Sequence, residues 1–174
     1  MDLVKAARKG QEAAFVQLFD EHHLPLFRFA YRLTGSVADA EDIVQECFLS
    51  LLRPECTYDS KRTPVRTYLF GIVRNQSLKR LRRNNFGVDA TGPRSPESDL
   101  LRDEMEEAVA RAVMELPEIQ REVLILAHYE QMPLGEIAQV LDIELGAAKS
   151  RLQRARASLK ETLAAYAPGL ERKR

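Results

Sequence analysis

The sequence predicts an all-α protein made of two small helical domains joined by a flexible linker. Apolar residues recur at three- and four-residue steps through most of the chain. No stretch alternates with period two between turn residues, so no sheet is expected. The segment 84–99 is rich in turn and chain-breaking signals, among them Gly92-Pro93 and Ser95-Pro96. We therefore predict a first domain at 1–84, a linker at 85–99 and a second domain at 100–174.

The composition, 45% hydrophobic and 30% charged, suits a globular protein and not a disordered one. Apolar runs such as Val123–Ala127 are far too short to cross a bilayer, and the N-terminus lacks the apolar core of a signal peptide, so a cytoplasmic location is expected. Cys47 and Cys56 have neither metal-ligand spacing nor a disulfide framework. The sequence contains no Gly-rich phosphate loop and no nucleophile–base–acid set. We expect no metal, no cofactor and no enzymatic activity.

The first domain is predicted to begin with a helix over about 11–33. Pro25 is expected to kink or divide this helix, and Gly35 to end it in the left-handed conformation. Ser36 is typical of the next N-cap, with Asp39 three residues later as its capping-box partner. Apolar residues at helical spacing then predict an amphipathic helix that Pro54 stops.

The polar face of this second helix carries an acidic stripe, formed by Asp39, Asp42 and Glu46 with Gln45 beside them. Like charges at helical spacing repel one another, so a surface helix normally mixes signs. The stripe is either an ordinary solvated face or a docking face for a basic partner. The sequence alone leaves both interpretations open.

The next segment, from Arg53 to Arg83, holds nine basic residues against two acids, a local net charge of 9 − 2 = +7. A polar loop over 59–63 precedes a predicted helix from Pro64 to about Arg83, with Thr63 as N-cap. Aromatic and cationic side chains alternate here, as suits single-stranded nucleic acid, although Tyr68 can equally be a core residue. The candidate residues are Tyr58, Lys61, Arg62, Arg66, Tyr68, Asn75, Lys79, Arg82 and Arg83.

The second domain is predicted to hold four helices. A helix at 133–141, a turn at 142–144 and a helix from Leu145 past Leu159 form the layout of a helix-turn-helix, whose second helix enters the major groove. This second helix presents side chains that neutralise phosphates or read base edges, and residues 146–160 contain no acid. A solvated amphipathic helix is the alternative. The candidate residues are Lys149, Ser150, Arg151, Gln153, Arg154 and Arg156.

Three motifs in the same order resemble those of sigma-70 family RNA polymerase sigma factors. The run 39–49 (DAEDIVQECFL) resembles region 2.2, and the run 68–75 (YLFGIVRN) with 81–83 (LRR) resembles regions 2.3 and 2.4. Leu116-Pro117, 121–123, 136–138 and 149–156 (KSRLQRAR) resemble region 4. The resemblance covers nearly the whole chain. Region 3 and the N-terminal extensions of primary factors are missing from the pattern, which is similar to the extracytoplasmic-function (ECF) group.

The resemblance implies core RNA polymerase, through its beta-prime clamp helices and beta flap, and promoter DNA as partners, with an anti-sigma factor allowed but not identified. In this family the acidic helix docks on the clamp helices, which implicates Asp39, Asp42, Gln45 and Glu46. The region 2 loop and helix melt the minus-ten element, which implicates Lys61, Arg62, Arg66, Tyr68 and Asn75, with Lys79, Arg82 and Arg83 nearby. The region 4 helix reads the minus-thirty-five element through Lys149, Ser150, Gln153 and Arg154.

Four positions depart from the family pattern. Tyr68 stands where tryptophan is frequent, and Lys79 where an acid is frequent. Asp142 and Glu144 stand in the helix-turn-helix where glycine and serine are usual. Aspartate tolerates the left-handed conformation better than most residues, and glutamate is a poorer cap than serine. These departures affect the promoter sequence expected rather than the fold.

Two other functions fit part of the pattern. A self-sufficient helix-turn-helix repressor or activator explains the C-terminal half but neither the acidic stripe nor the second basic patch. Such a regulator normally reads two half-sites as a dimer, and no dimerisation helix is evident. A helical adaptor without a DNA role is the alternative from another class.

Overall fold

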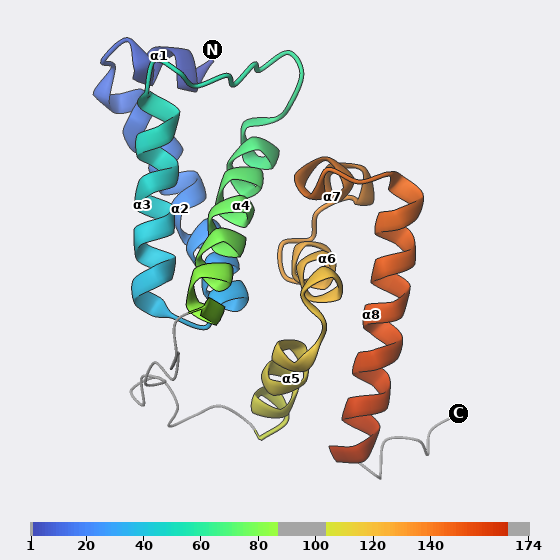
Figure 1. Cartoon of the computed structure of the whole chain (residues 1–174). Helices are drawn as coiled ribbons and strands as arrows, with labels where there is room; N and C mark the ends of the chain where they lie inside the picture. The colour runs from blue at the N-terminus through green and yellow to red at the C-terminus, as the bar shows by residue number, and fades with distance from the viewer. Residues whose placement is uncertain (1, 87–103, 167–174) are drawn as a thin grey trace. The chain divides into compact units, whose positions relative to one another are not determined.

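The structure, a computed structural model, describes residues 2–86 and 104–166. Within these ranges the chain forms eight helices and no strand, which confirms the all-α prediction (Figure 1). No described helix is long and apolar enough to span a membrane. The helices are α1 (Leu3–Arg8), α2 (Glu12–Thr34), α3 (Val37–Leu52), α4 (Val65–Phe86), α5 (Glu104–Glu115), α6 (Glu118–His128), α7 (Leu134–Leu141) and α8 (Leu145–Tyr166).

Contacts group the chain into two compact units. The first holds residues 1–92 and 139–142, and the second holds the remaining residues. The predicted linker begins inside a helix, because α4 continues to Phe86, three residues beyond its expected end. Residues 87–99 of the predicted linker, and residues 100–103 after it, lie outside the described residues. The domain boundaries therefore stay a prediction.

The core of the first unit forms where α2 packs against α3 and α4. Leu26, Phe29 and Leu33 of α2 are fully buried, as are Ile43 of α3 and Phe70 of α4. The Phe29 and Phe70 rings lie 5.2 Å apart between centroids. Each such side chain contributes about 1.5–3 kcal/mol when it leaves water, so the α2–α3–α4 arrangement is held mainly by these residues.

Pro25 does not divide α2, which rules out one of the two predicted outcomes, a divided helix, and leaves the predicted kink as a prediction. The helix runs from Glu12 to Thr34 with Pro25 inside it. Proline removes one backbone hydrogen bond and crowds the preceding turn. Leu26 and Phe29 directly after it are fully buried, and their packing keeps the helix continuous across the defect.

The junction between α2 and α3 follows the predicted capping pattern in part. Gly35 closes α2 with φ 71°, and the Ser36 side chain accepts a hydrogen bond from the Asp39 N–H at 3.2 Å. The reciprocal half of the capping box is missing, because the Ser36 N–H donates to the Thr34 hydroxyl at 3.3 Å instead. The Asp39 carboxylate is thereby left for another partner.

Helix α1 was not expected from the sequence. Asp2 caps it by accepting a hydrogen bond from the Lys5 N–H, and Val4, Ala6 and Ala7 are buried. An aspartate followed by apolar residues at helical spacing is the signal that predicts such a helix. Its six residues are too short for periodicity to stand out.

Helices α7 and α8 form the predicted helix-turn-helix. α7 ends at Leu141, Asp142 adopts φ 52°, and α8 starts at Leu145. Aspartate therefore takes the left-handed turn position that glycine usually fills. The Ile143 N–H donates to the Ala138 carbonyl, and the Ala148 N–H to the Glu144 carbonyl, both at 3.0 Å. These bonds fix the direction in which α8 leaves the turn.

Arg121 joins α6 to the end of α5. Its guanidinium donates to the carbonyls of Met114 at 2.6 Å and Leu116 at 2.9 Å, two acceptors that the end of a helix leaves unpaired. Burial lowers the pKa of Arg121. The Arg121 side chain thus caps the C-terminal end of α5 and fixes it to α6.

Candidate functional site

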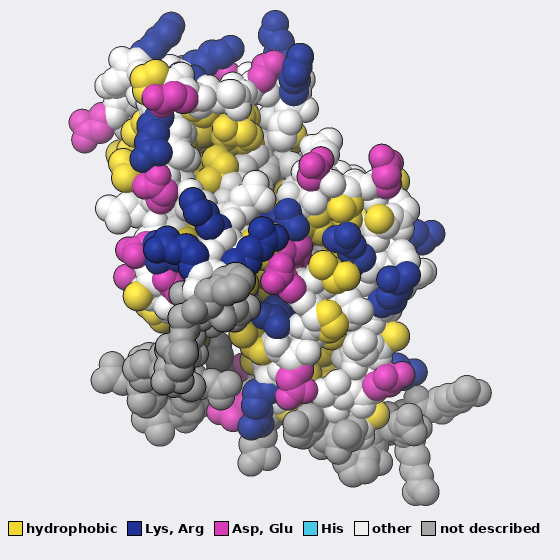
Figure 2. All heavy atoms as spheres, in the orientation of Figure 1, with side chains coloured by type: hydrophobic (Ala, Val, Ile, Leu, Met, Phe, Trp, Pro, Cys, Tyr) yellow, Lys and Arg dark blue, Asp and Glu magenta, His cyan; other side chains and the backbone are white. Residues whose placement is uncertain are grey.

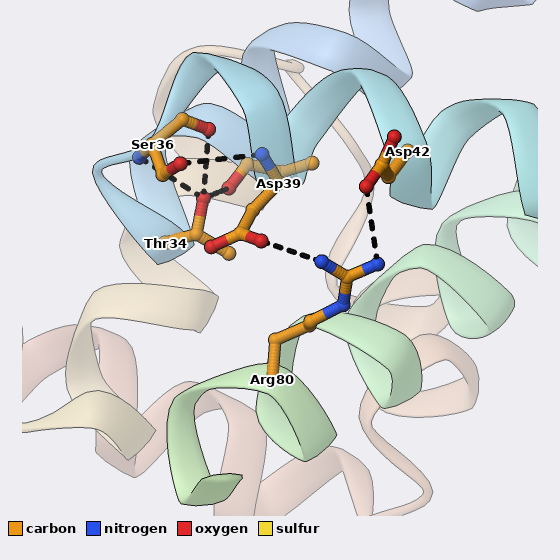
Figure 3. Close-up of polar contacts among 6 residues, drawn as sticks. Thr34, Ser36, Asp39, Asp42 and Arg80 are labelled. Atoms are coloured by element: carbon orange, nitrogen blue, oxygen red, sulfur yellow. Dashed lines mark hydrogen bonds and ion pairs between the residues drawn. The ribbon is translucent and has the colours of Figure 1, made fainter. Parts of the chain in front are cut away.

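The acidic stripe of α3 is paired with arginines of the same chain. Arg80 of α4 reaches between two of the acids, with one nitrogen 2.6 Å from Asp39 and the other 3.5 Å from Asp42 (Figure 3). Arg53, just beyond the end of α3, lies 2.8 Å from Glu46. The stripe itself contains no basic residue, but the fold places two arginine side chains against its acids. The three acids and two arginines leave a net charge of −3 + 2 = −1 on this face.

The stripe acids differ in how open they are to solvent. The Asp39 side chain is 21% exposed and sits at the capped start of α3, whereas Asp42 is 62% exposed. Glu46 is intermediate. Asp39 therefore acts partly as a structural link between α3 and α4, while Asp42 and Glu46 remain open to a partner.

A shallow hollow lies between α3 and α4 beside this face. Acidic and amide groups of α3 and basic groups of α4 line it together, and Figure 2 shows Lys and Arg side chains close to Asp and Glu over these two helices. Gln45 is exposed here. The lining residues are Asp42, Ile43, Gln45, Glu46, Leu49, Gln76, Lys79, Arg80 and Arg83.

The α3–α4 loop places two aromatic rings side by side. The Tyr58 and Tyr68 rings lie 5.0 Å apart between centroids, and both residues are half-buried. The Tyr68 hydroxyl lies 3.7 Å from the Cys56 sulfur. Burial raises the pKa of both tyrosines, so each ring is a neutral phenol at neutral pH. Tyr68 is thus partly a packing residue, and part of it stays open to solvent.

The loop cations are highly accessible. Lys61 and Arg62 are exposed, and Arg62 lies 3.6 Å from the Asp59 carboxylate. The Asp59 side chain also accepts a hydrogen bond from the Lys61 N–H at 3.0 Å, which shapes the turn. Exposed cations next to a paired ring platform match the chemistry of single-stranded nucleic acid, where cations follow the backbone and rings stack on bases.

The candidate residues of α4 differ in their exposure to solvent. The Arg66 guanidinium lies 5.5 Å from the centroid of the Phe70 ring and is half-buried, so it partly packs on the core. The uncharged Asn75 is exposed. So are Lys79, Arg82 and Arg83. On the inner side of α4, Leu69 and Val73 are fully buried, whereas Val65 and Ile72 are intermediate.

Helix α8 carries its candidate residues on its outward side and on the two flanks. Ala148, Leu152 and Ala155 form its buried face against the rest of the second unit. At 100° per residue, Ser150, Gln153 and Arg154 lie opposite this face. Lys149 and Arg156 lie together on one flank and Arg151 on the other. Gln153 and Arg154 are exposed, whereas Ser150 is intermediate.

Histidine and cysteine take structural places in the first unit. Cys47 is fully buried and packs as a small hydrophobic residue, and burial raises the pKa of its thiol to about 12. His23 stacks on Phe19 at 4.6 Å, and burial lowers the pKa of His22.

Two residues of this site, Arg80 and Arg53, were counted in the basic patch but not recognised as partners of the acidic stripe. Arg80 is 41 residues away from Asp39 in sequence, and no local pattern connects them. The seven-residue step from Glu46 to Arg53 spans two helical turns, which is the signal that predicts the other pair.

The two halves of the chain match separate family descriptions. Residues 18–86 match Sigma-70 region 2, and residues 106–159 match Sigma-70, region 4. Among curated proteins, the ECF RNA polymerase sigma factor SigL of Mycobacterium tuberculosis is 34% identical, over 94% of this chain and 96% of its own length. The ECF RNA polymerase sigma factor SigW of Bacillus subtilis is 27% identical, over 92% of this chain and 94% of its own.

Solved structures agree with these matches. CnrH, solved in complex with the cytosolic domain of CnrY, superposes with a TM-score of 0.72 at 27% identity, covering 94% of this chain and 96% of that one. The sigma factor RpoE of Bartonella quintana, solved with the anti-sigma factor NepR, gives 0.67 at 26% identity, covering 86% and 96%.

Proposed function

This chain belongs to the sigma-70 family of RNA polymerase sigma factors, in its extracytoplasmic-function group, and is a promoter-specific transcription initiation factor; we propose that it works through three separate faces. Helix α3 docks on core RNA polymerase, the α3–α4 loop with α4 binds and melts the minus-ten element, and α8 reads the minus-thirty-five element. Members of this family are transcription initiation factors and not enzymes.

The docking role of α3 is supported by the exposure of Asp42 and Glu46. Both carboxylates are held in place by an arginine yet remain open to solvent. The family suggests the beta-prime clamp helices as the basic surface that binds these carboxylates. Basic side chains of that surface replace the arginines as ion-pair partners, or share the carboxylates with them. Gln45 adds an exposed amide beside these carboxylates. For the region 4 part of the chain, the proposed polymerase partner is the beta flap.

The minus-ten role is supported by the ring pair and the cations around it. Tyr58 and Tyr68 form a neutral aromatic platform, with Lys61 and Arg62 exposed beside it. Extruding a base from a duplex costs a few kcal/mol, and stacking together with backbone contacts offsets that cost. Arg66 and Asn75 on α4 complete the surface, and Lys79, Arg82 and Arg83 contact backbone phosphates.

The minus-thirty-five role is supported by the arrangement of α8. Side chains that read base edges, Gln153 and Arg154, lie opposite the buried face, and cations lie on both flanks. The central residues specify sequence, while Arg151 and Arg156 contact phosphates. Ser150 and Lys149 complete the contact.

An anti-sigma factor is the regulator we propose for this chain. The relatives seen in solved complexes are bound to CnrY and to the anti-sigma factor NepR. Since its partners are the transcription machinery and promoter DNA, its proposed place of action is the cytoplasm.

The observation that carries the proposal is an acidic face in the same chain as two basic surfaces. A stand-alone repressor has no use for the carboxylates of α3, which repel DNA. An adaptor without a DNA role has no use for the outward side of α8, which has basic and no acidic side chains over residues 146–160. A factor that joins a basic protein surface to DNA uses both.

The test is transcription in vitro with core polymerase and a library of genomic fragments. Adding the chain should produce transcripts from a limited set of start sites that share minus-ten and minus-thirty-five sequences. Core polymerase alone, and the chain alone, are the controls. Tight sequence-specific DNA binding by the chain without polymerase, and no new transcripts with it, would instead favour the repressor.

A further inference from the structure

Three long-range hydrogen bonds tie helix α1 to the α3–α4 loop. The Arg8 guanidinium donates to the Pro54 carbonyl at 3.1 Å and to the Cys56 carbonyl at 3.5 Å. At the other end of α1, the Ser60 hydroxyl donates to the Asp2 carboxylate at 2.7 Å. Figure 1 shows the loop running past α1 on its way from α3 to α4. The loop is thus held at two points, its start and its middle.

Helix α1 is itself firmly placed. Val4, Ala6 and Ala7 are buried, and α1 packs on both α2 and α3. Asp2 uses one oxygen to cap α1 through the Lys5 N–H at 3.2 Å and the other to hold Ser60. The Ser60 hydrogen bond lowers the pKa of Asp2, so the carboxylate is charged at neutral pH and accepts both bonds.

The residues between and beside the two anchor points are those assigned to DNA. Tyr58 lies between Cys56 and Ser60, and its ring packs on Tyr68. Lys61 follows Ser60 directly. Tyr58 is half-buried and packs on Tyr68 of α4, Lys61 is exposed, and the Asp59 turn links only neighbouring loop residues, so the two anchors are the contacts that tie this part of the loop to α1.

We propose that Arg8 and Asp2 are positioning residues for promoter melting, with α1 serving as a brace that holds the α3–α4 loop in its DNA-binding shape. Neither residue touches DNA in this arrangement. They set the position of Tyr58, Lys61 and Arg62, and they lower the entropy that the loop loses when it binds a strand. The inference rests on the proposed role of the loop at the minus-ten element.

The matched pair of variants is Arg8→Ala and Lys9→Ala in the full chain. Both remove one exposed cation from the same end of α1, but the Lys9 ammonium has no hydrogen bond or ion pair with a described residue. Arg8→Lys keeps the charge and loses the planar fork that spans two carbonyls. Ser60→Ala removes the second anchor without changing any charge.

The first measurement is limited trypsin cleavage after Lys61 and Arg62 in the folded protein. Arg8→Ala should speed this cleavage about three- to tenfold, as expected for loss of a charge-assisted hydrogen bond at a solvent-exposed site, and Lys9→Ala should not. Ser60→Ala should give a smaller increase and Arg8→Lys an intermediate one. Thermal melting shows that each variant is folded.

The second measurement is open-complex formation with core polymerase on duplex and premelted promoters. Arg8→Ala should slow it about three- to tenfold on the duplex, less on the premelted template, with core affinity unchanged. Equal cleavage rates for Arg8→Ala and Lys9→Ala would overturn the brace. A loosened loop with normal promoter opening would overturn its role in positioning. If the wild type opens no promoter, the proposed function fails, while the cleavage rates still decide whether α1 holds the loop.

Discussion

The acidic face of α3 and the basic face of α8 carry charge in opposite ways. Each stripe acid on α3 has an arginine of the chain within 4 Å. On α8, none of Lys149, Arg151, Arg154 and Arg156 forms an ion pair with another residue in the described ranges. The acidic face of α3 is therefore largely neutralised within the chain, whereas the cations of α8 have no counter-charge from the described residues.

This difference predicts two kinds of binding. A partner of α3 exchanges one set of ion pairs for another, so the net electrostatic gain is small and depends weakly on salt. A polyanion on α8 meets unpaired cations and releases its own counterions, so its affinity falls steeply with salt. Shape and hydrogen bonding then decide partner choice on α3, and on α8 they decide DNA sequence.

Reversing two charges on α3 should give the largest effect. Asp42→Arg with Glu46→Arg places like charges beside Arg80, Arg53 and the basic partner. Core affinity should fall by about two orders of magnitude or more, measured by titration of labelled chain. Both side chains are accessible, so thermal melting should change little.

Glu41→Arg is the matched control for this reversal. Glu41 is an exposed acid of the same helix that lies off the stripe. Its reversal should leave core affinity nearly unchanged. Equal losses for Glu41→Arg and the double variant would mean that overall charge matters, and not the stripe.

Arg154→Ala should give the next largest effect, now on DNA. Loss of a base contact costs about 1–3 kcal/mol on the preferred site and relaxes preference at one position. Arg156→Ala should instead weaken binding to all sequences and reduce the salt slope by about one. Promoter-library selection at two salt concentrations measures both. Identical preference profiles for wild type and Arg154→Ala would contradict its assignment as a reader.

Asn75→Ala sharpens the comparison, because Asn75 carries no charge. Promoter opening should slow about tenfold on duplex DNA, as expected for a lost hydrogen bond, with an unchanged salt slope. A template premelted at the minus-ten element should restore the rate. Equal impairment on both templates would assign Asn75 to another step.

Arg80→Gln should give the smallest effect and the opposite sign. The variant changes the net charge of the α3 face from −1 to −2, so core affinity should rise a few-fold and become more salt-dependent. Stability should fall by about 1 kcal/mol because Asp39 loses its partner. A loss of core affinity in a folded variant would show that Arg80 supports docking instead of competing with it.

The sequence predicts best what short-range patterns control. Pro133 and Asp142 place the two helices and the turn of the helix-turn-helix within about a residue. Ser36 and Gly35 likewise mark the α2–α3 junction. Each of these signals acts within four residues, which is the range of helix capping and periodicity.

The features that the sequence does not predict depend on packing between distant segments. Arg80 meets Asp39 and Asp42 across two helices, and Arg8 meets the α3–α4 loop more than forty residues away. Pro25 is read as a helix breaker because its local cost is known, whereas the burial of Leu26 and Phe29 that outweighs it is a tertiary effect. The pairing that distinguishes α3 from α8 belongs to this second class.

The most direct test of three faces with three partners is site-specific crosslinking in one initiation complex. A photoreactive residue replaces in turn Gln45, Asn75 and Gln153, all exposed and uncharged, so the charged groups stay intact. We predict that Gln45 crosslinks to the beta-prime subunit, Asn75 to minus-ten DNA and Gln153 to minus-thirty-five DNA. A crosslink from Gln45 to DNA, or from Asn75 and Gln153 to the same promoter element, would contradict the account.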